Sequence, residues 1–215
     1  MYICDIMLSV YSDIETKVRK VRPGQIFIPS DFKDLGTSTA IRKALSRLVE
    51  KELLVRMGQG IYVKPLYDKI FGLVLPSLED IAVVLANKDR VIIKPTGQYA
   101  LNKLGLSTQV PTNIVFLTNG TKKKIKIGKN TINFLPTTTK KIAMIGPISS
   151  LLFLGLEDLE LKLLSELEMH KIISLLRQED VKKLSHDLKL TSSKISDFVI
   201  KNLKNKENVR LDSKS

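Results

Sequence analysis

Residues 37–64 read TSTAIRKALSRLVEKELLVRMGQGIYVK, and they give the clearest structural signal in this chain. Successive residues of an α-helix are about 100° apart, so Ile41, Leu45 and Leu48 fall on one apolar stripe. This spacing predicts an amphipathic helix over residues 40–52. The opposite side of that helix carries Thr, Ser, Arg and Lys residues, with no acidic residue before its last turn.

The segments around this helix follow the order of a winged helix-turn-helix. Apolar residues spaced by three and four predict a helix over residues 5–21, and a cap signal followed by glycine predicts a short helix over 29–35. After the central helix, two β-prone runs at 53–57 and 61–64 flank a glycine-rich tip and predict a hairpin. In a winged helix, the helix that follows the turn enters the major groove of DNA.

Nine polar side chains are therefore expected to contact DNA. Arg42 and Lys43 can donate to guanine, while Thr39 and Ser46 can reach bases or phosphates. Hairpin residues would contact the phosphate backbone, which sets the register without reading sequence. The full expected set is Ser38, Thr39, Arg42, Lys43, Ser46, Arg47, Arg56, Gln59 and Lys64. A basic helix face also occurs in domains where it only faces solvent, and that alternative stays open.

Composition makes nucleic acid the first partner to consider. The chain has 215 residues, of which 43% are hydrophobic and 27% charged, as in soluble globular proteins. Its formal net charge is +13, which attracts polyanions. That charge is distributed as +4 over residues 1–65, +8 over 66–150 and +1 over 151–215, so the C-terminal part is electrically balanced.

A cytoplasmic protein without membrane contact is expected. The one cysteine cannot form an internal disulfide or a cysteine-rich zinc site. An acidic residue, Asp5, interrupts the start of the chain, where a signal peptide is basic and then apolar. The most apolar run, residues 144–156, is shorter than the ~20 residues that span a bilayer, and it predicts a buried core helix.

The rest of the chain predicts a second, α+β domain over residues 66–215. Its middle part shows helix signals at 78–86 and 96–105, and strand signals at 91–93, 113–118, 124–127 and 131–134. From residue 156 to about 204, leucines and isoleucines at helical spacing predict a helical tail that ends in a frayed C-terminus.

The predicted fold class is thus α+β in two parts. A winged helix-turn-helix DNA-binding domain occupies residues 1–65. It is followed by an α+β domain with a small antiparallel sheet and a helical C-terminal region.

A lysine-rich stretch in the middle part offers a second basic surface. It contains seven lysines and no acid: Lys122, Lys123, Lys124, Lys126, Lys129, Lys140 and Lys141. These side chains can extend a polyanion-binding surface. They can equally decorate an exposed edge strand and prevent sheet-to-sheet aggregation. Both interpretations stay open.

Two blocks of residues agree in order and spacing with one family. The first is GQIFIPSDF at 24–32 with ALSRLV at 44–49 and GIY at 60–62; the second is TG at 96–97 with ALN at 100–102, LGLSTQVP at 104–111 and FLTNG at 116–120. Over roughly residues 5–160 the chain resembles the AbiEi-type antitoxins of bacterial abortive-infection systems. It is similar in particular to their short, DUF6088-like branch.

The resemblance implies two activities. The N-terminal winged helix would bind double-stranded operator DNA upstream of its own operon and repress transcription. The C-terminal domain would counter a nucleotidyltransferase-like toxin, as in type IV toxin-antitoxin systems. In the better-known members, the antitoxin acts without forming a stable complex with the toxin.

An enzyme is not expected. His170 and His186 lie sixteen residues apart and lack the i, i+4 pairing of a helical zinc site. Cys4 lies in an apolar stretch and reads as a small core residue. Acidic pairs at 79–80 and 157–158 stand at predicted helix starts, where carboxylates favour the positive end of the dipole. We therefore expect no catalytic residue, no metal site and no cofactor.

Two hypotheses for function remain. The first is a DNA-binding transcriptional autorepressor and antitoxin that uses the 40–52 helix for base contacts. A homodimer on DNA is compatible with this hypothesis, because helix-turn-helix proteins often read two-fold repeats. The alternative is a protein-interaction module that binds and neutralises a toxin directly, without reading DNA sequence.

Overall fold

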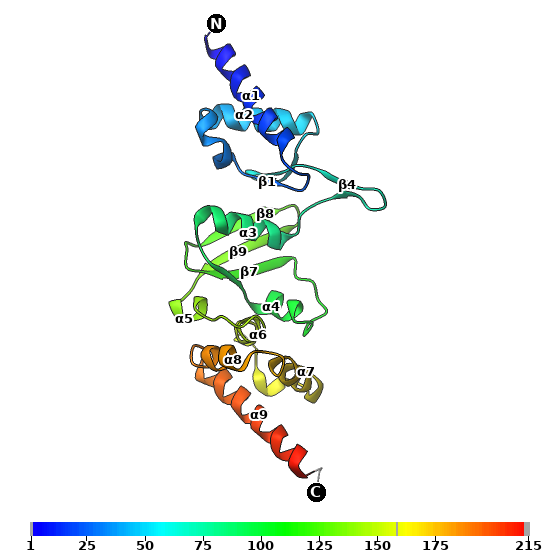
Figure 1. Cartoon of the computed structure of the whole chain (residues 1–215), viewed down its shortest axis with the longest axis vertical. Coiled ribbons are helices and arrows are strands. Elements are labelled where there is room, and N and C mark those ends of the chain that lie inside the picture. Colours follow the sequence, from blue (N-terminus) through cyan, green and yellow to red (C-terminus); the bar gives the residue numbers. More distant parts are fainter. Residues whose placement is uncertain (1, 158, 213–215) are drawn as a thin grey trace. The chain divides into compact units, whose positions relative to one another are not determined.

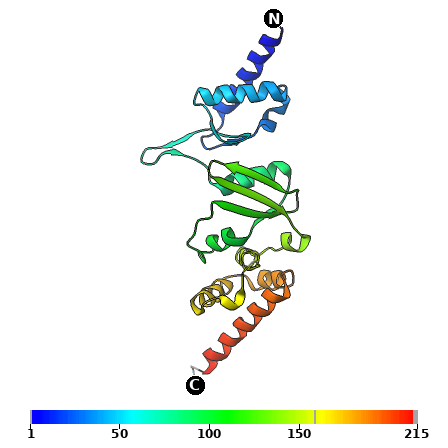
Figure 2. The ribbon, with the colours of Figure 1, turned by 180° about the vertical axis from the view of Figure 1, so that it is seen from behind.

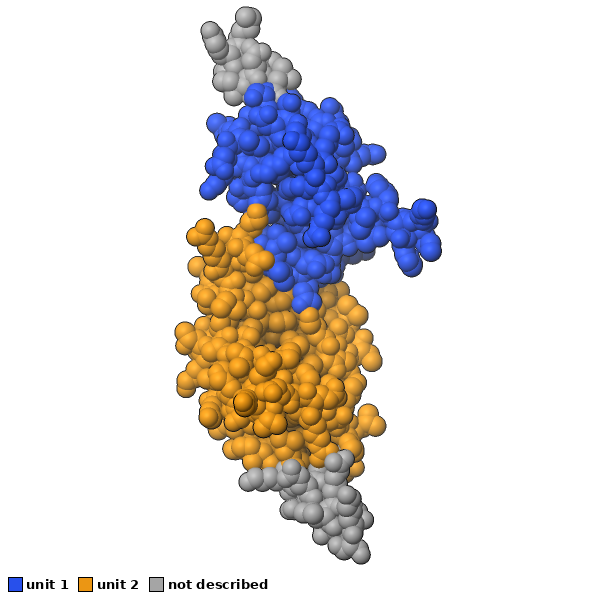
Figure 3. Space-filling view, in the orientation of Figure 1, with its two compact units in different colours: residues 1–85, 125–131 blue, residues 86–124, 132–215 orange. Residues whose placement is uncertain are grey.

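The structure is a computed structural model that describes residues 2–157 and 159–212. It divides into two compact units, residues 1–85 with 125–131 and residues 86–124 with 132–215 (Figure 3). The sequence favours a boundary after residue 65. In the structure, the segment 66–85 and the tip of a later hairpin both belong to the first unit.

The first unit begins with three helices and three short strands. These are α1 (Tyr2–Lys20), β1 (Ile26–Phe27), the 3-10 helix η1 (Pro29–Leu35), α2 (Ser38–Glu50), β2 (Val55–Gly58) and β3 (Ile61–Val63) (Figure 1). Both β1 and β2 pair with β3 in antiparallel fashion. The short helix expected before the turn is therefore present, in the tighter 3-10 form.

The core of the first unit lies between α1, η1 and α2. The apolar faces predicted from helical spacing are confirmed, since the side chains concerned are at most 3% exposed: Val10, Ile14, Val18, Ile41, Leu45 and Leu48. Phe32 of η1 is 1% exposed, and its ring lies 5.6 Å from that of Phe27. This burial fixes the orientation of α2 and leaves its polar side toward solvent.

A second hairpin follows, which the sequence analysis does not predict. Strands β4 (Leu66–Asp68) and β5 (Gly72–Val74) pair only with each other in a separate two-stranded sheet. The hairpin projects from the first unit in both ribbon views (Figures 1 and 2). Helix α3 (Leu78–Asp89) comes next and crosses the boundary between the units.

The second unit combines strands with a set of helices. Its elements are β6 (Ile93–Pro95), α4 (Gly97–Lys103), β7 (Asn113–Thr118), β8 (Lys123–Ile127), β9 (Asn130–Pro136), α5 (Thr139–Ile142), α6 (Ser149–Leu156), the 3-10 helix η2 (Leu161–Leu163), α7 (Glu166–Leu176), α8 (Val181–Leu188) and α9 (Ser193–Asp212). The tip of the β8–β9 hairpin, residues 125–131, belongs to the first unit. Helix α4 packs against α6.

Helix α6 is the centre of the second core. Leu152, Phe153, Leu154 and Leu156 are at most 1% exposed. A buried helix is predicted here, but the structure confines it to the last eight residues of the predicted span. Pro147 lies two residues before this helix, and a proline has no amide to donate within a helix.

The main sheet is larger than the small antiparallel sheet expected from the sequence. Seven strands follow the order β1-β3-β2-β8-β9-β7-β6. The β2–β3 hairpin joins the β8–β9 hairpin where Gly58 pairs with Ile127, and both of these residues belong to the first unit. A side chain at position 58 would place its Cβ 2.6 Å from the carbonyl oxygen of Lys126, so glycine permits this close approach. Such long-range pairing leaves no local signal.

The predicted helical tail is also interrupted. Leucine spacing favours one helix from residue 156 into 167, but the chain leaves α6 at Leu156 and begins α7 only at Glu166. Ser165 caps α7 by accepting the Glu168 amide, while the Glu168 carboxylate accepts the Ser165 amide. This capping box starts a new helix, so the leucine spacing across it has no structural meaning. Helix α9 then continues past residue 202, where the sequence favours fraying, to Asp212.

Candidate nucleic-acid interface

Helix α2 presents its polar face to solvent. The hydroxyl oxygen of Thr37 caps the helix by accepting a hydrogen bond from the Ala40 amide at 3.3 Å. Six of the nine expected DNA-binding residues lie on the exposed side: Ser38, Thr39, Arg42, Lys43, Ser46 and Arg47. The helix thus exposes two arginines and a lysine to solvent, while the apolar stripe on its opposite side is buried.

The β2–β3 hairpin adds two more of the expected residues. A bulge between Arg56 and Gly58 precedes the turn. Gly60 has φ +70°, a left-handed conformation that glycine adopts without steric cost. Arg56 and Gln59 are exposed, and the Arg56 Nε donates to the Gly58 carbonyl at 3.4 Å. The bulge and the glycine turn therefore set the direction of the arginine side chain.

A hollow of about 350 Å³ joins α2 to this hairpin. It is lined by Pro29, Arg42, Ser46, Arg56, Gln59, Gly60 and Tyr62. Four of the expected residues are therefore brought together, although they come from two separate elements. The expected residues bring two guanidinium groups, a hydroxyl and a carboxamide to the hollow, and none of its lining residues is acidic. Such a set of donors suits a phosphate oxygen or the acceptor edge of a base.

Lys64 has a different role from the one expected for it. Its ammonium donates to the carbonyl oxygens of Arg19 and Val21, each at 2.8 Å. These carbonyls lie at the C-terminal end of α1, where unpaired acceptors and the helix dipole attract a cation. Lys64 therefore ties β3 to α1, and we leave it out of the interface.

The seven lysines of the second basic surface differ in their surroundings. Lys123 forms an ion pair with Asp89 at 2.8 Å, and Lys141 forms one with Glu157. The other five are exposed: Lys122, Lys124, Lys126, Lys129 and Lys140. Along β8, exposed Lys124 and Lys126 alternate with more buried isoleucines, as expected for a strand with one face in water. This arrangement is consistent with either interpretation of the lysines.

Two buried carboxylates in the second unit were not found by sequence reasoning. Asp187 accepts the amides of Ile145 and Gly146 at 2.8 and 2.9 Å and the Ser149 hydroxyl at 2.6 Å. Glu179, 7% exposed, accepts the amides at positions 148 and 149 at 2.7 and 2.9 Å. Both acids lie in charged sequence and look like surface residues, so no local signal in the sequence marks them as buried.

This pair forms a structural clamp on the start of α6. A Cβ at Gly146 would lie 2.7 Å from a Glu179 oxygen and 3.0 Å from an Asp187 oxygen, so the position requires glycine. Burial raises the pKa of Asp187, but hydrogen bonds from Ser149, His186 and the two amides outweigh it, and the pKa lies below its ordinary value.

The same cluster contains serine, histidine and aspartate, yet it is not arranged for nucleophilic catalysis. A catalytic serine needs its hydroxyl on the imidazole, which takes the proton. Here the Ser149 hydroxyl donates to Asp187, and Ser149 is 0% exposed. His186 contacts the other oxygen of Asp187 at 3.0 Å. No substrate can reach this hydroxyl without unfolding the start of α6.

No group of three or more His, Cys, Asp and Glu side chains among the described residues lies close enough to hold a metal ion. No helix within residues 2–157 or 159–212 is both long enough and apolar enough to cross a bilayer.

Comparison with known proteins gives one result. A family profile described as "Family of unknown function (DUF6088)" matches residues 13–184. This range includes α2, both hairpins of the first unit, and most of the second unit through Leu184 of α8. No curated protein matches the chain.

Proposed function

Because this chain belongs to the DUF6088 family, whose function is unknown, its activity must be argued from its site, and we propose that its first unit binds double-stranded DNA. Helix α2 acts as the recognition helix of a winged helix-turn-helix, and the β2–β3 hairpin acts as the wing. The observation that supports this most strongly is the acid-free hollow that Arg42 and Ser46 share with Arg56 and Gln59.

The order of elements in the first unit supports the same proposal. A short helix, η1, precedes a turn at Gly36 and then α2, whose apolar stripe packs against α1. In a helix-turn-helix, the second helix lies in the major groove with its N-terminal residues near the bases. Ser38 and Thr39 occupy that end of α2, where the helix dipole also favours a phosphate.

Two substitutions separate base reading from phosphate binding. Arg42→Ala removes a donor on the recognition helix, and we expect a loss of about 1–3 kcal/mol that is confined to the preferred sequence. Arg56→Ala removes a wing contact, and it should weaken binding to every duplex alike and lower the log-log salt slope by about 0.9.

The measurement is a titration of labelled duplexes, with the DNA upstream of the gene set against a scrambled duplex at several salt concentrations. Arg177→Ala is the matched control, because it removes one exposed arginine in the second unit and leaves the hollow unchanged. Equal losses on both duplexes for Arg42→Ala and Arg56→Ala would contradict the division of labour. No binding at low salt would end the proposal.

We further propose, from the resemblance to AbiEi-type antitoxins, that this DNA binding represses the chain's own operon in the cytoplasm. The second unit then counters a nucleotidyltransferase-like toxin encoded beside it. Growth of cells that express the adjacent gene, with and without this chain, tests the antitoxin activity. A variant that lacks DNA binding, Arg42→Ala with Arg56→Ala, should still rescue growth, because the two activities lie in different units.

A second candidate function is direct capture of a protein partner, and one surface of the second unit favours it. A groove of about 660 Å³ is lined by apolar side chains that include Leu161, Leu164 and Phe198, with lysines among its lining residues. Leu163, which lies between two lining residues in the chain, is 77% exposed. An amphipathic helix with an acidic polar face fits such a groove.

A pull-down with the product of the adjacent gene tests this second candidate. Leu163→Ser should abolish capture without changing stability, because its side chain is already in water. Capture that survives this substitution would locate the contact elsewhere. If growth is rescued without any capture of the toxin, the result favours the DNA-binding antitoxin that acts without a stable complex.

A further inference from the structure

The β4–β5 hairpin, residues 66–75, is here called the arm, and it exposes several large apolar side chains next to one another. Tyr67, Ile70 and Phe71 are 68%, 85% and 81% exposed. A two-stranded hairpin is at best marginally stable alone. Contiguous apolar patches of this kind mark sites of association. The arm therefore needs a partner surface.

The arm has a defined shape. The Asp68 carboxylate accepts the amides of Ile70 and Phe71 at 2.8 and 3.0 Å, and Gly72 turns the chain with φ +69°. These contacts hold the tip and present two large apolar side chains side by side in the sequence. An ordered tip loses little conformational freedom on binding, which favours a specific contact.

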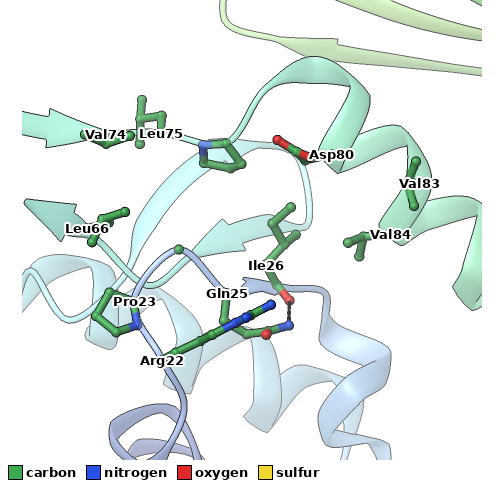
Figure 4. Close-up of a pocket in the computed structure, with 12 residues that line it drawn as sticks. Arg22, Pro23, Gln25, Ile26, Leu66, Val74, Leu75, Asp80, Val83 and Val84 are labelled. Atoms are coloured by element: carbon green, nitrogen blue, oxygen red, sulfur yellow. Dashed lines mark hydrogen bonds between the residues drawn. The ribbon is translucent and has the colours of Figure 1, made fainter.

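A matching cavity lies at the base of the same arm. It has a volume of about 570 Å³, and the base of the arm, the segment 22–26 and helix α3 form its walls (Figure 4). Leu66, Val74 and Leu75 line it from the arm, and Val83 and Val84 line it from α3. All of these residues belong to the first unit, and we call this cavity the groove.

We propose that a second copy of this chain docks here, with the arm tip of each copy in the groove of the other. A two-fold axis makes the two contacts identical and closes the assembly at two copies. The tip lies about four residues, or ~13 Å, from the base of its own arm. Two arms packed side by side in opposite directions would therefore bring each tip to the other's groove.

Charge favours a protein over nucleic acid as the occupant. The arm carries one acid and one base, Asp68 and Lys69, so it has no net charge. Arms that insert into DNA carry arginines and lysines for the phosphates. The groove is lined by one base and one acid, Arg22 and Asp80, which complement the charges of the arm.

The area available is that of a stable dimer. At about 200 Å² for a large side chain, the three most exposed apolar residues of the arm leave about 450 Å² in water. Two reciprocal contacts therefore cover about 900 Å² of arm surface, together with the smaller area of the two grooves that the tips fill. Specific interfaces bury about 1,200–2,000 Å².

Sedimentation velocity of the full chain without DNA tests the proposal independently of DNA binding. The wild-type chain should be a dimer across about 1–100 µM, since interfaces of this size have micromolar or tighter affinities. Phe71→Lys on the arm and Val83→Glu in the groove should each weaken the dimer at least 100-fold. Val110→Asp is the matched control, because this residue is 83% exposed in the second unit and should change nothing.

Mixing the two variants gives the decisive measurement. A mixed dimer of the Phe71→Lys chain and the Val83→Glu chain has one native contact and one lysine–glutamate contact, so a 1:1 dimer should reappear. A monomeric wild-type chain at about 100 µM would overturn the proposal. A dimer that Phe71→Lys leaves intact, or mixed variants that stay monomeric, would overturn it as well. A monomer whose affinity for DNA falls with Phe71→Lys would assign the arm to nucleic acid instead.

Discussion

Replacing the buried Asp187 by asparagine tests how the second unit is held together. The two carboxylate oxygens accept two backbone amides, of Ile145 and Gly146, and the Ser149 hydroxyl. In Asp187→Asn one oxygen becomes an amino group that faces these donors, so at least one buried donor loses its acceptor. An unsatisfied buried donor costs about 1–3 kcal/mol, and each hydrogen bond to a charged group contributes about 1.5–3 kcal/mol. We expect the free energy of unfolding to fall by about 3–5 kcal/mol.

Urea denaturation measures this loss. With a slope of about 2 kcal/mol per molar urea, the midpoint should fall by about 2 M. Asp180→Asn is the control, because Asp180 caps α8 by accepting the amides of Lys182 and Lys183, each at 3.0 Å. Asparagine caps a helix as well as aspartate does, so this variant should keep its midpoint. Equal, small shifts for both variants would refute the clamp.

The dependence of stability on pH tests whether the charge of Asp187 contributes to folding. Since the pKa of Asp187 lies below its ordinary value of 3.8 in the folded chain, the charged form favours folding. This contribution is fully present above the unfolded pKa and is lost as the pH falls through the lower, folded pKa. The difference between the wild type and Asp187→Asn should therefore be constant near neutral pH and narrow below pH 3.8. A difference that is unchanged in acid would show that the charge of Asp187 plays no part.

Further variants at Gly58, Lys64 and the lysines of the β8–β9 hairpin have expected outcomes. Gly58→Ala should destabilise the first unit by about 1–3 kcal/mol in thermal unfolding, because the new Cβ would lie 2.6 Å from a backbone oxygen; Gly128→Ala meets no atom within 4 Å and should cost only about 1 kcal/mol for its left-handed backbone. Lys64→Met should lower stability by about 2 kcal/mol, because α1 loses two hydrogen bonds to a charged donor, while the salt slope of DNA binding stays unchanged. Lys126→Ala combined with Lys129→Ala should lower that slope by about 0.9 per lysine if both contact phosphates; an unchanged slope with increased aggregation would show that they only protect the sheet.

Elements with a local cause could be predicted from the sequence. The buried and exposed sides of α1 and α2 follow from residue spacing alone, because a helix repeats every 3.6 residues whatever lies around it. Strands β7, β8 and β9 likewise follow from β-prone runs between turn signals. The same spacing placed Arg42 and Ser46 on one face, so half of the hollow was predictable.

Features that depend on residues far apart in the chain could not be predicted from the sequence. The join between Gly58 and Ile127 depends on two backbones that meet about seventy residues apart, and neither residue is unusual in its own segment. The clamp of Glu179 and Asp187 depends on amides more than thirty residues earlier in the chain. The contact of Lys64 with the end of α1 could not be predicted for the same reason, since only the fold brings the two together.

The arm was overlooked for a different physical reason. Its sequence alternates weakly, and its tip carries an aspartate and a lysine between apolar residues. Sequence patterns identify segments that bury one face in their own chain. A segment that buries its apolar side chains against another molecule has no such pattern to satisfy. Exposure in the folded chain, at 81% for Phe71, is what distinguishes it.

The two unpartnered surfaces of the first unit differ in chemistry, and this difference separates their partners. The hollow beside α2 is polar and cationic, so its affinity for a polyanion depends on released counterions and falls as salt rises. The arm carries no net charge and large apolar side chains, so its contacts depend on the area removed from water and hold or strengthen in salt. One solution condition therefore acts on the two surfaces in opposite directions. A chain that loses DNA but keeps its dimer in high salt would have two separate binding surfaces within one unit.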